Sequence, residues 1–181
     1  MRQDLSRRAL IVTAGAASLT LAAQPSSAQP AAPSLVPVMT FRVEIGAGIE
    51  VGEVPGGRRR IVPIIGGRVD GDLKGTILPG GADWQTLRPD GMTEIWARYT
   101  IQPDGGGPAV IVTNPGVRKA SAEVSARLAA GEDLDPSLYY FRASPVFETG
   151  APALRWLTES VFVCAGERHP DHVALKIFRV T

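Results

Sequence analysis

Cysteine and histidine are scarce in this chain, and their scarcity limits the kinds of site it can carry. Cys164 is the single cysteine, and the chain has only two histidines. One cysteine cannot form an internal disulfide, and the cysteine clusters that bind structural zinc or iron–sulfur centres are missing. The sequence therefore predicts neither a disulfide-stabilised scaffold nor a cysteine-based metal centre.

Motifs for nucleotide binding and nucleophilic catalysis are absent as well. The chain has no Gly-x-Ser-x-Gly elbow, phosphate loop or dinucleotide fingerprint. Cys164 lies in an apolar run without an evident base, which favours a small core residue over a reactive thiolate. The formal net charge of +1 shows no excess of positive charge that would favour nucleic acid. We therefore expect neither a cofactor nor a nucleic acid partner.

The first 28 residues have the pattern of an export signal. Arginines precede an apolar, alanine-rich run over residues 9–23, and small residues follow at 26–28. The pair Arg7 and Arg8 resembles the twin-arginine form of such signals. An uncleaved anchor is the alternative, but the run is shorter than the about 20 apolar residues that a spanning helix needs. We expect residues 1–28 to be removed, leaving a periplasmic or secreted protein without a membrane attachment.

The remainder predicts one domain behind a short tether. Residues 29–38 are rich in proline and alanine, as linkers often are. Residues 39–181 form a domain of ordinary size, able to bury roughly two thirds of its unfolded surface without disulfides. We therefore expect a single core.

Short alternating segments separated by glycine and proline dominate that domain. Pro63 breaks an apolar run and predicts an edge or bulged strand position there, which leaves room for a homodimer. Ser121 predicts the N-cap of one short helix over residues 123–130, which Gly131 ends. The clearest expected strands lie at residues 40–45, 73–78, 94–101, 109–113, 138–143, 156–164 and 173–180.

This pattern favours a mainly β fold. Eight or nine strands at roughly ten-residue spacing, with one short helix, predict an antiparallel β-barrel, with a two-sheet sandwich as the alternative. A barrel of about eight strands is wide enough to enclose one small ligand. We therefore look for polar side chains that would face such a lumen.

Several motifs resemble one family, in order from residue 38 to 180: Gly56 to Ile61 (GGRRRI), Pro63 to Gly67 (PIIGG), Leu78 to Gln85 (LPGGADWQ), Ala97 to Thr100 (ARYT), Tyr139 to Arg142 (YYFR) and Phe147 to Gly150 (FETG). Together they are similar to the domain of unknown function family 3237, also called uncharacterised protein family 0311. The resemblance implies a small barrel of calycin-like or allene-oxide-cyclase-like shape and supplies no mechanism. In that family an Asp tends to stand at the position of Trp96 and an Asn at that of Thr158, so a role copied onto Arg98 is weakened.

The hairpin over residues 80–101 concentrates the candidate residues. Asp83 and Trp84 follow a double glycine, where a carboxylate could sit at the mouth of a barrel or simply form a turn beside a core Trp. On the returning strand, Tyr99 belongs to the more natural inner face, whereas strand parity favours an outward Arg98. Asp83 is a candidate catalytic base, and Trp84, Arg98 and Tyr99 are candidate ligand-binding residues.

Further candidates lie on later strands. Arg118 and Arg142 could hold a ligand carboxylate by bidentate contacts, or face outward in solvated ion pairs. One of the two phenols of Tyr139 and Tyr140 must face inward, and we select Tyr140 as the ligand-binding one. Glu148 is a second candidate base if it is desolvated, although a salt bridge to Arg142 is the commoner arrangement.

Two further clusters have plainer interpretations. His169 and His172 have a spacing that suits a metal, but no third ligand is evident, so a hydrophilic turn is favoured and no metal is expected. Arg58, Arg59 and Arg60 could form a phosphate patch, but after two glycines they are more typical of a solvated strand entry.

Three functions stay open. The first is a carrier that binds a small, partly apolar carbonyl- or carboxylate-containing molecule in the lumen, anchored by Arg142, Arg118 and Tyr140. The second is a cofactor-free enzyme of isomerase, cyclase, lyase or lactone hydrolase type, with Glu148 or Asp83 as base. The third is a structural or protein-binding module.

Overall fold

The computed structural model describes residues 31–181, so the expected export signal lies outside the described residues. The strands are β1 (Leu35–Ile45), β2 (Ile49–Val54), β3 (Gly57–Gly71), β4 (Gly75–Ile77), β5 (Gly81–Leu87), β6 (Met92–Pro103), β7 (Val110–Lys119), β8 (Tyr140–Ala143), β9 (Val146–Thr149), β10 (Phe162–Arg168) and β11 (His172–Val180). The helices are α1 (Ala122–Ala129) and two 3₁₀ helices, η1 (Pro136–Leu138) and η2 (Pro152–Leu157).

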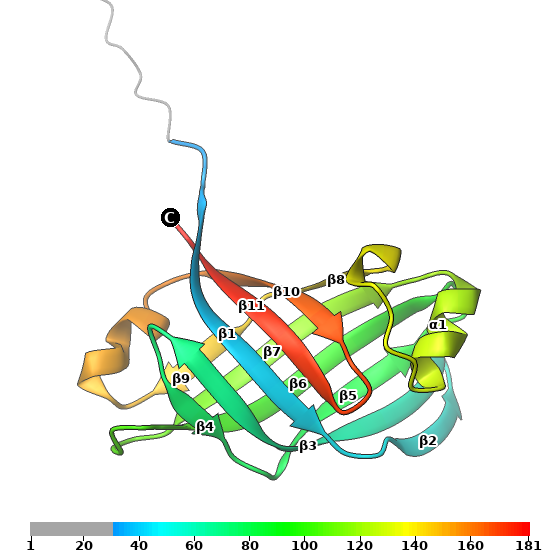
Figure 1. Cartoon of the computed structure of the whole chain (residues 1–181), viewed down its shortest axis with the longest axis horizontal. Coiled ribbons are helices and arrows are strands. Elements are labelled where there is room, and N and C mark those ends of the chain that lie inside the picture. The colour runs from blue at the N-terminus through cyan, green and yellow to red at the C-terminus, as the bar shows by residue number, and fades with distance from the viewer. Residues whose placement is uncertain (1–30) are drawn as a thin grey trace, which may run out of the picture. The chain divides into compact units, whose positions relative to one another are not determined.

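Eight of these strands close into an antiparallel barrel, as the sequence predicts (Figure 1). Around the barrel the order is β1, β3, β5, β6, β7, β8, β10 and β11, and β11 pairs with β1 to complete the circuit. Three short strands extend it: β2 pairs with β3, β4 lies between β3 and β6, and β9 pairs with β7. Closure leaves the barrel strands few unpaired edges.

Alternation along each strand decides which side chains face the lumen. In β6, Ile95, Ala97, Tyr99 and Ile101 are buried, while Glu94, Trp96 and Arg98 between them are exposed. This is the period of two that a strand with one covered face requires. The apolar core therefore lies inside the barrel, where Phe41, Phe147 and Phe162 pack edge to face.

The expected short helix is present. Val124 N–H donates to the Ser121 hydroxyl oxygen at 3.2 Å, and Gly131 has φ of 84° just after the last turn. A serine at the N-cap and a glycine in the left-handed region are the usual helix boundaries. The helix follows β7 directly and therefore lies at the end of the barrel where β7 ends (Figure 1).

Two segments of the barrel wall differ from the expectation. Strand β1 begins at Leu35, which pairs with Val180, so residues 35–38 belong to the barrel wall and not to a tether. Pro63 is not at an edge, because it lies inside the 15-residue strand β3, which has β1 on one side and β5 on the other. The register shift opposite it, between Glu44 and Ile45, confirms the bulge instead. Pro63 therefore offers no free edge to a second copy of the chain.

Trp156 was expected in a strand and lies in η2 instead. Pro152 begins this turn of helix, and the indole packs edge-on against Phe162 with ring centroids 5.8 Å apart. The apolar run of residues 156–164 is therefore two elements, since strand β10 starts only at Phe162. Within residues 31–181, no helix has the length and apolar character needed to cross a membrane.

Candidate functional site

Polar side chains gather inside the barrel at the end where β7 reaches α1. Gln85, Asn114 and Arg118 are buried there, and Asp83 lies beside them in the wall of a cavity of about 50 Å³. The other walls are mostly aliphatic and come from β1, β3, β6 and β11: Val43, Ile45, Val62, Ile64, Ile95, Val173 and Leu175. A small apolar pocket with a few converging polar groups is the usual form of a ligand site.

Asp83 is held by hydrogen bonds on both carboxyl oxygens. The backbone N–H of Trp96 donates to Asp83 Oδ1 at 2.9 Å, and Gln85 Nε2 donates to Asp83 Oδ2. Burial raises the pKa of the Asp83 carboxyl, and these two donors oppose the rise. Asp83 is therefore a fixed carboxyl group that accepts a proton more readily than an exposed one.

Arg118 faces the cavity and is 7% exposed. In the part of the chain that the structure describes, no carboxylate oxygen lies within 4.0 Å of its guanidinium. Burial lowers the pKa of Arg118 to about 10, and the positive charges of Arg60 and Arg168 lower it further. The side chain thus stays charged at neutral pH without a close counter-ion.

Two more polar groups in the cavity lack a partner. Across residues 31–181, the Tyr99 hydroxyl and the Asn114 side-chain oxygen are buried without a hydrogen bond. Burial raises the pKa of Tyr99, so its hydroxyl stays protonated and is able to donate. Buried polar atoms are normally paired, so these two point to a bound molecule or water in the cavity.

Arg60 and Arg168 complete the site, and neither is among the candidates predicted from the sequence. Arg60 Nε donates to Gln85 Oε1 at 2.7 Å, and Arg168 lines the cavity at the last residue of β10. Arg60 was interpreted as part of a solvated strand entry, but it shares the inward face of β3 with buried Val62. Counting strand parity back from Val62 would have found it.

Other candidates lie outside the lumen. Trp84 and Arg98 are on the outer face, and Glu148 is outside as well, with its Oε1 atom 3.6 Å from Arg98 Nη2. The prediction of a desolvated base at Glu148 is therefore wrong. Its side chain is 59% exposed, and Phe147, the residue before it in β9, occupies the inward-facing position. The outward orientation favoured for Arg98 is confirmed.

Tyr140 and Arg142 also face outward, which corrects their expected place in the lumen. Tyr139 is the inward phenol, and its hydroxyl accepts from the backbone N–H of Arg168 at 2.9 Å. Tyr140 is 53% exposed, and the Arg142 guanidinium lies 5.2 Å from the centre of its ring. Alternation along β8 allows either Tyr139 or Tyr140 to face inward. Phe141 packs in the core, so its neighbour Tyr140 faces outward.

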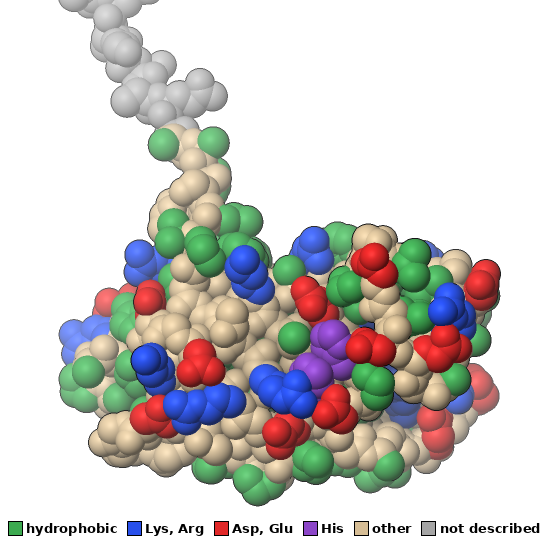
Figure 2. Space-filling model, in the orientation of Figure 1, with side chains coloured by type: hydrophobic (Ala, Val, Ile, Leu, Met, Phe, Trp, Pro, Cys, Tyr) green, Lys and Arg blue, Asp and Glu red, His purple; other side chains and the backbone are tan. Residues whose placement is uncertain are grey.

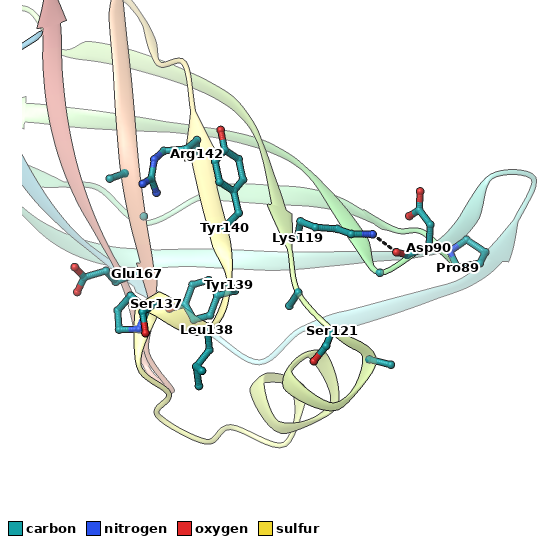
Figure 3. Close-up of a pocket in the computed structure, with 16 residues that line it drawn as sticks. Pro89, Asp90, Lys119, Ser121, Ser137, Leu138, Tyr139, Tyr140, Arg142 and Glu167 are labelled. Atoms are coloured by element: carbon teal, nitrogen blue, oxygen red, sulfur yellow. Dashed lines mark hydrogen bonds between the residues drawn. The ribbon is translucent and has the colours of Figure 1, made fainter.

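These two residues line a wide, open surface groove beside β8 (Figure 3). Lys119 reaches across it, and its Nζ atom donates to the backbone oxygen of Asp90. The groove has a volume of about 1040 Å³ and opens to solvent along its length. It is separate from the lumen site, because Tyr140 and Arg142 leave the opposite face of the sheet.

The two histidines stack on each other near the turn between β10 and β11, with ring centroids 4.4 Å apart (Figure 2). His169 Nδ1 lies 2.8 Å from Asp133 Oδ1, and His172 Nδ1 lies 2.6 Å from Asp171 Oδ1. Among the described residues, no three His, Cys, Asp or Glu side chains are arranged to hold a metal ion.

The fold and the interior site together define a small antiparallel β-barrel with a charged pocket at one end. The chain belongs to the family described as "Protein of unknown function (DUF3237)", which matches residues 33–180. The resemblance seen in the motifs is thereby confirmed.

Three relatives illustrate the match. A UPF0311 protein of Bradyrhizobium diazoefficiens is 43% identical over 143 residues, which cover 79% of this chain and 93% of that protein. The crystal structure of a conserved protein of unknown function from Rhodopseudomonas palustris has a TM-score of 0.81 at 38% identity, covering 84% of this chain and all of that one (100%). A β-barrel-like protein from Acinetobacter baumannii has a TM-score of 0.74 at 36% identity, with 86% and 100% covered.

Proposed function

We propose that this chain is an exported β-barrel protein that binds a small, partly apolar molecule through a carbonyl or carboxylate group in the lumen pocket. The observation that carries the proposal is Arg118, which is 7% exposed and, within residues 31–181, has no carboxylate oxygen within 4.0 Å. Burying a charge without a close counter-ion costs up to several kcal/mol. An oxygen-bearing ligand would supply the missing partner.

The unpartnered groups define the polarity of that ligand. The Tyr99 hydroxyl, which has no hydrogen bond, and the Arg118 guanidinium, which has no carboxylate within 4.0 Å, both donate, so they suit a carbonyl or carboxylate oxygen. The Asn114 oxygen accepts, so it suits a hydroxyl or amide N–H on the same molecule. The aliphatic walls suit the hydrocarbon part.

The cavity volume limits how much of the ligand is enclosed. About 50 Å³ corresponds to roughly three to five water-sized positions. A ligand therefore inserts an acid or carbonyl head and a few further atoms. Any larger part extends towards the end of the barrel near α1.

The export part of the proposal is supported only by the arginine pair and the apolar run of the first 28 residues. Expression of the full chain with and without Arg7→Lys plus Arg8→Lys, followed by fractionation, tests it. Loss of the shortened protein from the periplasm in the variant is the expected result. An unchanged distribution would contradict twin-arginine export.

A cofactor-free enzyme is the second candidate, and the pKa of Asp83 favours it. A carboxyl group with a pKa raised by burial, at the wall of a pocket, is suited to accept a proton and return it. Glu148 has no part in it, since it lies on the outer face. A turnover assay of small lactones and enones with Asp83→Asn separates the candidates, because a carrier returns its ligand unchanged.

The binding test compares two arginines that differ in location. Arg118→Met keeps the length of the side chain inside the lumen, and Arg142→Met makes the same change on the outer face. Isothermal titration with small carboxylic acids and ketones, guided by mass spectrometry of co-purified compounds, should show binding that Arg118→Met abolishes and Arg142→Met retains. Equal binding by both variants would show that the ligand does not enter the lumen.

A further inference from the structure

Three arginines point into the same end of the barrel from strands far apart in the sequence. Arg60 on β3, Arg118 on β7 and Arg168 on β10 follow the inward parity of Val62, Asn114 and Cys164 respectively. Arg118 and Arg168 line the cavity, and Arg60 binds its wall through Gln85. Arg118 is buried deepest, and the other two are half-buried nearer the opening.

None of the three has a salt bridge within residues 31–181, although ion pairs are common elsewhere on this barrel. On the outer surface, arginines pair with carboxylates at Arg42, Arg58, Arg68, Arg88, Arg98, Arg127 and Arg155. Burial makes a counter-ion more necessary inside than outside. Here the buried arginines lack the salt bridges that the exposed arginines have, which is the opposite of what their burial requires.

Asp83 does not neutralise this group. Its two oxygens already accept from the Trp96 N–H and from Gln85 Nε2, and it lies farther than 4.0 Å from each guanidinium. Asp83 is the one carboxylate in the cavity wall, against two guanidiniums there and a third bound to the wall through Gln85. Glu50 acts on Arg60 and Asp171 on Arg168, but neither carboxylate lies within 4.0 Å of these guanidiniums. The positive charges of Arg60 and Arg168 lower the pKa of Arg118, and that of Arg60 also lowers the pKa of Arg168, so the charges of the group oppose one another.

We infer that the ligand is a dianion, either a small dicarboxylate or a phosphorylated compound, with one anionic group at Arg118 inside the cavity and its remaining negative charge between Arg60 and Arg168 at the opening. This inference rests on the proposed lumen binding and adds the charge of the ligand. The cavity has room for one acid group and a few atoms, so the second acid group must lie at the opening, where the two half-buried arginines are. Guanidinium groups bind carboxylate and phosphate oxygens in bidentate geometry.

Succinate and butyrate test the charge requirement, because they share a four-carbon chain and differ by one carboxylate. Isothermal titration of the purified protein at low ionic strength should give at least about tenfold tighter binding of succinate, with a steeper loss of affinity as salt is added. Inorganic phosphate and phosphoenolpyruvate form the second arm. Binding of these in place of succinate supports a phosphorylated ligand.

Variants separate the two anionic positions. Arg60→Met and Arg168→Met should each weaken succinate binding by about tenfold or more beyond their effect on butyrate binding, whereas Arg118→Met should abolish binding of both acids. Arg142→Met on the outer face is the matched control and should change neither. Circular dichroism melting confirms that each variant is folded, and Arg60→Gln and Arg168→Gln replace any variant that is not.

The outcomes distinguish this inference from the proposal beneath it. Equal affinity for succinate and butyrate, or a preference that survives both Arg60→Met and Arg168→Met, overturns the dianion and leaves lumen binding in place. Absence of binding by every acid and by phosphate, in protein freed of co-purified compounds by unfolding and refolding, overturns both.

Discussion

The backbone N–H of Trp96 donates a hydrogen bond to Asp83 Oδ1 at 2.9 Å, so a side chain of β5 satisfies a backbone donor of β6. Asp83 is therefore part of the barrel wall as well as of the pocket. The same carboxyl also accepts from Gln85, whose oxygen accepts from Arg60, so a chain of hydrogen bonds runs from the wall to the opening. Because hydrogen-bonded groups polarise one another, a substitution of Asp83 should change the strength of the hydrogen bond between Arg60 and Gln85.

Asp83→Asn should change how stability depends on pH. Burial raises the pKa of Asp83 above its ordinary 3.8, so the folded state holds this proton more tightly than the unfolded state. Its contribution to the free energy of unfolding is therefore greatest below about pH 4 and falls as pH rises through the folded-state pKa. Asparagine does not titrate, so the free energy of unfolding of the variant should increase relative to that of the parent as pH rises through this range.

Urea unfolding of the parent and Asp83→Asn at several pH values between about 3.5 and 8 measures this difference. The variant also loses one hydrogen bond, which costs about 1 kcal/mol at every pH and leaves the slope of the difference unaffected. Surface carboxylates titrate in both proteins and cancel. A difference that is constant with pH, or that falls as pH rises, contradicts a raised pKa at Asp83.

Arg118→Met should stabilise the protein while it removes binding. Replacing a buried charge that has no close counter-ion with an apolar side chain of similar length removes a desolvation penalty, and we expect a gain of about 1–2 kcal/mol in the free energy of unfolding. Groups that function requires often lower the stability of the folded protein. Thermal melting of the ligand-free protein checks it, with Arg142→Met as the control that should change little.

A lower melting temperature for Arg118→Met would mean that contacts of the guanidinium hold the barrel together. Arg118→Ala is informative in that case, because it removes the hydrocarbon part as well. Alanine should be less stable than methionine by about 1–3 kcal/mol, since it leaves a void.

Much of the fold was predictable from the sequence, because alternation and glycine turns are local features. The hairpin of β5 and β6, the cap at Ser121 and the inward Tyr99 follow from residues near them in the chain. Alternation does not say which of two faces is inside when both carry mixed side chains. Tyr139 and Tyr140 illustrate the problem, because only packing of Phe141 against distant strands selects the inward phenol.

The pocket was harder to predict than the fold. Arg118 and Asp83 were selected, but Arg60 was hidden in a run of three arginines, and Arg168 stands at the end of a strand whose start was placed at Trp156 instead of Phe162. Their convergence depends on which strands close the barrel. The pairing of β1 with β11 joins residues more than 100 positions apart, which no local pattern records.

Gly166→Ala should destabilise the barrel, whereas Gly105→Ala should not. A Cβ atom on Gly166 would lie 2.7 Å from ring atoms of Phe141, which itself packs in the core. Overpacking of this kind costs about 1–3 kcal/mol. Gly105 has no atom within 4 Å of such a Cβ and is the matched control. Equal unfolding midpoints for the two variants in urea would show that the ring of Phe141 moves freely.

Cys164 should report opening of the barrel. Its side chain is 1% exposed, and burial raises the pKa of the thiol to about 11, so little reactive thiolate exists at neutral pH. A thiol reagent such as Ellman's reagent should therefore modify it only as the barrel unfolds. Val161→Cys, at a position 67% exposed, provides a thiol that reacts at once.

The same measurement also detects ligands, because Cys164 lies beside Asn114, which lines the pocket. If labelling requires global unfolding, a ligand that binds only the folded state slows it by the factor 1 + [L]/Kd. Succinate at about a hundred times its Kd should then slow the modification of Cys164 about a hundredfold and leave the exposed thiol of Val161→Cys unaffected. Rapid labelling of Cys164 in the native protein, with or without ligand, would mean that the lumen opens locally without unfolding, and the closed pocket would have to be abandoned.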